Sequence, residues 1–163
     1  MTAQEAFGLV RLAGRHALPL SLAETIVANA ILVAAGLSFN DAAVTTLAGQ
    51  SRAGQGGATL AREGECWRLK DTLRRVRWTR TAITVAVLAP GEDGLCVASL
   101  PAGSFALSLG RNLADEPRDD MTFDAILPAS AVGAAPAGWG AAYGERLGAA
   151  LRAVAMAGSW RKE

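Results

Sequence analysis

Residues 82–109 read AITVAVLAPGEDGLCVASLPAGSFALSL, and this stretch decides the fold. Pro- and Gly-rich turns divide it into three runs of strand length: 83–88, 95–100 and 104–110. The last run alternates with period two, so that Phe105, Leu107 and Leu109 share one face. Apolar or alternating runs between turn residues are typical of β-strands. We therefore predict three strands in a meander, with four core side chains: Val85, Val87, Phe105 and Leu107.

Helical patterns precede this stretch. Apolar residues recur at helical spacing over residues 3–17. Ser21 and Glu24 form the sequence signature of a capping box, which predicts a second helix running to about Ala35. A third helix is expected from Ser38 to about Ala48.

The segments around the meander are less clear. Polar–apolar runs at 59–69 and 73–88 predict strands, with either a bulge at 79–81 or a short helix at 72–78. We expect an exposed acidic loop at 113–120, and 121–127 fits either a strand or a helix. A final amphipathic helix is predicted from an apolar stripe at helical spacing: Trp139, Tyr143, Leu147, Leu151 and Val154.

Helices at the two ends and strands between them predict an α+β fold. We expect an antiparallel meander sheet of about four to five strands, with N-terminal helices and a C-terminal helix packed against it. The chain has 163 residues, which suits a single domain over 1–163. Its parts would be a helical part, a sheet part, and a loop with the C-terminal helix: 3–50, 57–110 and 111–160.

Composition excludes several kinds of site. The chain has one histidine, His16, so it cannot build a site with several histidine ligands. Cys66 and Cys96 match no metal or redox spacing. The glycine-rich run 49–57 lacks the lysine and hydroxyl of a phosphate-binding loop. We predict no catalytic residue, no cofactor and no metal, and the N-terminus, without a signal-peptide pattern, favours a cytoplasmic protein.

Cations concentrate in one segment although the net charge of the chain is only +1. Residues 52–80 hold eight Lys and Arg residues against three carboxylates, and the acidic excess lies at 92–124. Arginines beside tryptophans can bind single-stranded nucleic acid by stacking, but a solvated sheet face paired with the acidic loop is the favoured interpretation. The candidate interaction residues are Trp67, Arg74, Arg75, Arg77, Trp78 and, near the C-terminus, Trp160.

One family resemblance covers residues 18–100. The order of a helix pair and then antiparallel strands, with Ile26-Val27-Ala28-Asn29-Ala30 before a turn at 36–38, resembles a PAS sensor domain. The resemblance implies a strand at 22–28, where the capping box at Ser21 favours a helix.

No set of residues in the sequence forms a coherent catalytic group. The function hypothesis is therefore a small cytoplasmic protein-interaction or adaptor domain without catalytic activity, which binds a protein partner or its own copy. One alternative is a PAS-like small-ligand sensor. The other is a nucleic-acid-binding module that uses the arginine-rich segment 62–80.

Overall fold

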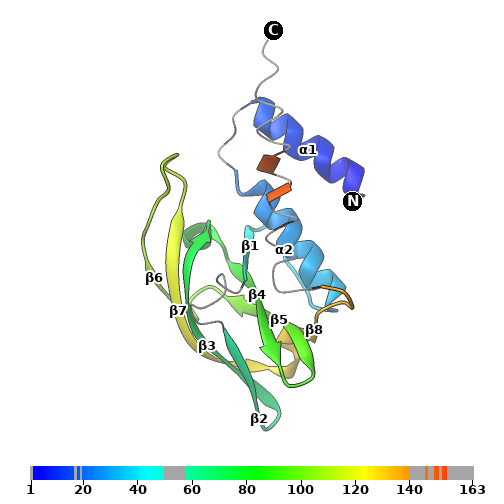
Figure 1. The fold of residues 1–163 in the computed structure, drawn as a ribbon, viewed down its shortest axis with the longest axis vertical. Helices are drawn as coiled ribbons and strands as arrows, with labels where there is room; N and C mark the ends of the chain where they lie inside the picture. Colours follow the sequence, from blue (N-terminus) through cyan, green and yellow to red (C-terminus); the bar gives the residue numbers. More distant parts are fainter. Residues whose placement is uncertain are drawn as a thin grey trace.

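The computed structural model describes residues 2–16, 18, 20–49, 58–139, 146, 149–150 and 152–153. Two N-terminal helices precede a series of strands (Figure 1), so the α+β class is confirmed. The helices are α1 (Ala3–Arg15) and α2 (Leu22–Ala34). The strands are β1 (Thr45–Ala48), β2 (Thr59–Glu63), β3 (Cys66–Arg77), β4 (Thr84–Gly91), β5 (Gly94–Pro101), β6 (Ala106–Ser108), β7 (Arg118–Pro128) and β8 (Val132–Ala134). Two 3-10 turns, η1 (Thr79–Thr81) and η2 (Ala129–Ala131), follow β3 and β7.

The strands form two four-stranded sheets, not the single meander that was predicted. One sheet has the order β1-β4-β5-β8 and is mixed, because β1 runs parallel to β4. The other has the order β2-β3-β7-β6 and is antiparallel. The predicted hairpin of β4 and β5 is confirmed, but its third strand, β6, pairs with β7 in the other sheet.

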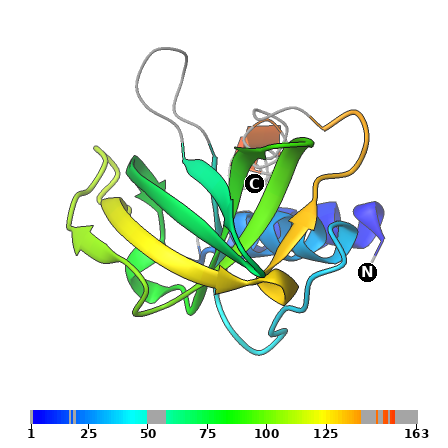
Figure 2. The same ribbon diagram turned by 90° about the horizontal axis from the view of Figure 1, so that it is seen from below.

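The helices, the mixed sheet and the antiparallel sheet form three layers. The position of the mixed sheet in the middle explains the sequence of β4. Figure 2 shows α1 and α2 on the side of the mixed sheet that faces away from the antiparallel sheet. Val85 and Val87 pack between the two sheets, whereas Ala86 and Leu88 pack against α2. A strand buried on both faces is apolar throughout, as β4 is.

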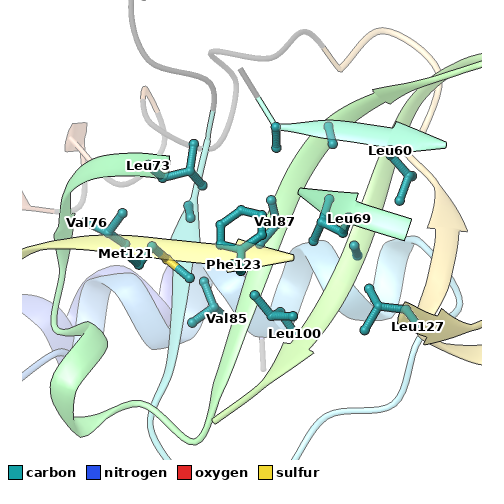
Figure 3. Close-up of a cluster of buried hydrophobic side chains, with 14 residues drawn as sticks. Leu60, Leu69, Leu73, Val76, Val85, Val87, Leu100, Met121, Phe123 and Leu127 are labelled. Atoms are coloured by element: carbon teal, nitrogen blue, oxygen red, sulfur yellow. The ribbon is translucent and has the colours of Figure 1, made fainter. Parts of the chain in front are cut away.

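The core between the sheets contains fourteen buried residues, ten of which are labelled in Figure 3. Val85 and Val87 are fully buried, as predicted. Phe105 and Leu107 are only partly buried at the edge of this core, and Leu109 is 68% exposed. Burial of Phe105 and Leu107 was therefore predicted correctly, but its extent was overestimated, because β6 is a three-residue edge strand.

The first two helices are confirmed, with a change in how they begin. Thr2 and Glu5 form a capping box at α1, with Glu5 N donating to Thr2 Oγ1 and Thr2 N donating to Glu5 Oε2. Ser21 stands at the start of α2 but its side chain makes no capping hydrogen bond. Glu24 is buried in ion pairs instead, so the predicted capping box does not form.

Other predictions of secondary structure need correction. The helix expected at 38–48 is wrong, because residues 45–48 are β1 and gain ladder hydrogen bonds from β4. Residues 72–78 are not a helix; the bulge lies at 73–76, and 79–81 is a 3-10 turn. Residues 118–128 are all strand β7, so 121–127 is a strand and the acidic loop is shorter than predicted.

The predicted C-terminal helix falls mainly on residues outside the described part of the chain, including Tyr143, Leu147, Leu151 and Val154. Trp139 is described, and it packs against the α2 side of the mixed sheet. Among the described residues, no helix is long and apolar enough to cross a bilayer.

Candidate functional site

Charged side chains gather where β3 ends and β7 begins, and we call this region the arginine corner. Its register places Val76 opposite Asp119 and Arg77 opposite Arg118. The corner contains five arginines and four carboxylates: Arg74, Arg75, Arg77, Arg80 and Arg118, with Glu24, Glu116, Asp119 and Asp120. Arg74 and Arg75 are exposed, and exposed cations suit an anionic ligand.

Asp119 and Arg80 form the buried pair of the corner. Asp119 is fully buried, and the side chain of Arg80 is 22% exposed. Arg80 Nε donates to Asp119 Oδ2 at 3.1 Å, and Arg80 Nη2 donates to Asp119 Oδ1 and to the Gly110 carbonyl. Gly110 N also donates to Asp119 Oδ1 at 3.0 Å. The guanidinium therefore joins η1 to β7 and to the backbone before β7.

Both groups of this pair are held in their charged forms. Burial alone raises the pKa of Asp119, but the hydrogen bonds from Arg80 and Gly110 outweigh it and hold that pKa below its usual range. The hydrogen bond to Asp119 raises the pKa of Arg80. Two such donors to a carboxylate favour its ionised form.

A chain of ion pairs links the corner to the helices. Glu24 of α2 is 7% exposed and lies 3.8 Å from Arg77 Nε and 2.9 Å from Arg152 Nη1. Arg77 Nη1 in turn lies 3.8 Å from Glu116 Oε2, which accepts a hydrogen bond from Arg118 Nη2 at 2.8 Å. Glu24 thus connects α2, β3 and the residue at 152.

The backbone of the corner adopts conformations that side-chain-bearing residues rarely take. Arg75 has φ 56° and Trp78 has φ 57°. Strain at non-glycine residues of this kind concentrates at functional sites. Nearby hydroxyls are used internally, because Thr46 Oγ1 donates to the Arg77 carbonyl and Thr79 Oγ1 to the Val76 carbonyl.

The predicted interaction residues divide into two groups. Arg74, Arg75, Arg77 and Trp78 lie within one stretch of five residues at the corner. Trp67 lies at the other end of β3, where it is partly buried and Arg62 stands over its ring at 5.8 Å. Trp160 lies outside the described residues.

The sequence interpretation missed the acidic side of the corner. Asp119 and Asp120 were assigned to an exposed loop, and Glu24 to a helix cap. One sequence signal pointed to the acidic side. Residues 52–80 hold more cations than carboxylates, and the acidic excess at 92–124 balances them. Arg68, for example, donates to both oxygens of Asp124 at 2.7 and 2.9 Å, which is a pair within the sheet and not one with the acidic loop at 113–120.

The remaining candidates carry no chemistry that the structure supports. Cys66 and Cys96 are free thiols, and burial raises the pKa of Cys96. His16 ends α1 as its C-cap. Within the described residues, no group of three or more His, Cys, Asp or Glu side chains could hold a metal ion.

Comparison with known proteins gives one kind of match. No family model and no curated protein matches the chain. Among solved structures, the Tcur3481-Tcur3483 steroid ACAD G363A variant matches with a TM-score of 0.75 at 19% identity, covering 95% of this chain and 46% of that chain. The ChsE4-ChsE5 complex from Mycobacterium tuberculosis gives 0.70 at 16%, covering 92% and 43%.

A glutaryl-CoA dehydrogenase from Mycobacterium smegmatis in complex with FADH2 matches a smaller part of the chain. Its TM-score is 0.53 at 20% identity, and the match covers 70% of this chain and 34% of that chain. The chain thus has a fold found in acyl-CoA dehydrogenases and spans about half the length, or less, of these solved structures.

These matches overturn the function hypothesis drawn from the sequence. The adaptor interpretation, the PAS-like alternative and the nucleic-acid alternative were wrong, as was the expectation that the fold is not that of an enzyme. The fold neighbours include a glutaryl-CoA dehydrogenase in complex with FADH2 and an FAD-dependent dehydrogenase. The error has a physical cause, because the corner is assembled from segments that lie far apart in the sequence, as the pairing of Glu24 with Arg77 shows.

Proposed function

We propose that this chain is part of a flavin-dependent dehydrogenase that acts on an acyl thioester. The observation that carries the proposal is the overlap of 95% of the chain with the steroid ACAD at a TM-score of 0.75. Such an enzyme removes two hydrogens from the acyl chain and passes them to the flavin. In this proposal the described residues supply the sheet scaffold and the arginine corner.

The described residues do not by themselves fit a complete flavin site. A flavin ring needs hydrogen-bond donors along its polar edge and a flat apolar surface beside it. Trp78 could supply the surface, but the hydroxyls of Thr46, Thr79 and Thr81 donate to main-chain carbonyls. Thr45 Oγ1 lacks a partner in the described part, but it is fully buried. We therefore assign no step of the reaction to these residues.

We infer that the site is completed by residues beyond those described here, in the same polypeptide or in a second chain. The solved structures that match are about twice as long, and one of them is a complex of two named proteins. The helical layer supports a second chain, because Leu9 and Leu12, three residues apart on α1, are 45% and 53% exposed. Exposed apolar side chains that lie near one another mark interaction surfaces.

The test uses the protein purified under mild conditions from the cells that make it. We expect a preparation with the visible absorption of a flavin, which acyl-CoA thioesters bleach and an electron-accepting dye restores. The same preparation without thioester is the control for spontaneous dye reduction. A preparation with no flavin absorption and no thioester-dependent dye reduction would refute the proposal.

A further inference from the structure

Among the residues that the structure describes, two arginines of the corner differ from the rest in having no carboxylate partner. Within the described part of the chain, Arg77, Arg80 and Arg118 all lie within ion-pair distance of an acidic side chain. No such pair involves Arg74 or Arg75 there, and both side chains are exposed. Two adjacent unpaired guanidinium groups are available to an anion from solution.

A bulge in β3 takes Arg74 and Arg75 out of the regular pairing of the strand. Leu73 pairs with Met121 and Val76 with Asp119, so Arg74 and Arg75 together face the single residue Asp120 on β7. A bulge of this kind redirects side chains that would otherwise alternate between the faces of a sheet, and bulges are frequent next to active sites.

The bulge is fixed by its own hydrogen bond. Arg75 N donates to Asp120 Oδ1 at 2.8 Å, so the carboxylate is committed in part to the backbone. The side chains of Arg74, Arg75 and Asp120 together carry a net charge of +1. Arg75 holds φ 56°, where glycine would be unstrained, so the arginine is retained at a conformational cost. The hydrogen bond from Arg75 N to Asp120 Oδ1 offsets part of that cost.

Two exposed arginines at neighbouring positions suit a phosphate ligand. Guanidinium groups bind phosphate oxygens through paired N–H donors, and two adjacent ones match a dianionic phosphomonoester. The exposed hydroxyls of Thr72 and Thr122 lie 3.1 Å apart one pair before the bulge and could donate to the same group.

We propose that the Arg74–Arg75 bulge binds the phosphomonoester of a nucleotide-bearing substrate, the class to which coenzyme A thioesters belong. The bulge is the evidence for a phosphate ligand. The choice of a nucleotide-bearing substrate rests on the proposed function. The flavin cofactor carries a diphosphate and no phosphomonoester, so the two sources can be separated by experiment.

The experiment is calorimetric titration of the full chain with adenosine 3′,5′-bisphosphate, and with FAD and inorganic phosphate in parallel. The double variant Arg74→Ala/Arg75→Gly removes both guanidinium groups while keeping a residue that tolerates the φ of position 75. We expect it to weaken bisphosphate binding about tenfold or more. Lys70→Ala removes an exposed cation from the same strand and should change the affinity by less than about twofold.

Three results would overturn the inference. They are no bisphosphate binding by the unaltered chain, an equal loss in Lys70→Ala, or FAD binding that is tighter than bisphosphate binding and equally sensitive to the double variant. The outcome is separable from the flavin assay above. Bisphosphate binding without dehydrogenation would refute only the proposed function, and dehydrogenation with an unaltered KM in the double variant would refute only the phosphate site.

Discussion

Replacing Asp119 by asparagine removes the negative charge of a fully buried group while keeping its shape. The carboxylate accepts hydrogen bonds from Arg80 Nε, Arg80 Nη2 and Gly110 N. An asparagine retains one oxygen and turns an amide donor toward the guanidinium. The variant thus leaves Arg80 without its counter-ion at a site where little water can replace it.

The expected loss of stability follows from the burial of the pair. Removing one partner of a fully buried ion pair costs about 3–5 kcal/mol. Arg80 keeps about a fifth of its exposure, so water can reach it in part, and we expect about 2–4 kcal/mol for Asp119→Asn. Urea denaturation of the variant and the unaltered protein measures this difference in the free energy of unfolding.

The matched control is Asp124→Asn on the same strand. Asp124 also pairs with an arginine, Arg68, but its side chain is 40% exposed and that of Arg68 is 45% exposed. We expect this exposed pair to contribute far less than the buried one. Equal losses for the two variants, or a loss below about 1 kcal/mol for Asp119→Asn, would refute the reasoning that burial makes the Asp119 pair strong.

The pair of Asp119 and Arg80 also predicts how the stability of the protein changes in acid. The pKa of Asp119 is lower in the folded chain than in the unfolded chain, so its contribution is present above the unfolded value of about 3.9 and declines as pH falls through the folded value. We therefore expect the difference between Asp119→Asn and the unaltered protein to shrink in acid. A difference that is constant from neutral pH into acid would contradict this assignment.

Three further predictions concern the rest of the molecule. A Cβ at Gly133 would lie 2.2 Å from the Ala35 carbonyl oxygen, so Gly133→Ala should lower the melting temperature by moving β8 from the end of α2, and an unchanged melting temperature would show that the contact is adaptable. Phe123→Ala should cost about 3–5 kcal/mol, and Phe105→Ala, at the core edge, clearly less; the reverse order in urea denaturation would refute the core assignment. Burial raises the pKa of Cys96, so its alkylation should be slow near neutral pH and accelerate in base, which mass spectrometry of the labelled chain measures.

The sequence predicted those parts of the fold whose signal is local. The hairpin of β4 and β5 has apolar strands and a turn-forming connection, and it formed as expected. The parallel pairing of β1 with β4 has no local signal, because it joins Thr45 to Thr84 across two intervening strands. Residues 45–48 were consequently assigned to a helix on the strength of their apolar neighbours.

The site was harder to predict than the fold. The cations at Arg74, Arg75 and Arg77 were identified from their density along the chain. The carboxylate partners of Arg77, Glu24 and Glu116, could not be matched to it, because they come from α2 and from the segment before β7, far away in the sequence. The same limitation hid Asp119, whose neighbours Pro117 and Asp120 read as a solvated loop.

The ion-pair chain gives the helical layer a physical route to the arginine corner. Glu24 is the only carboxylate of α2, it is buried, and it lies beside Arg77 and Arg152. Arg77 occupies the last position of β3, two residues after Arg75, so a shift of α2 that moved Glu24 would act on the strand that carries the bulge. The ion pair of Glu24 with Arg77 therefore connects α2 directly to the strand that carries the proposed phosphate site.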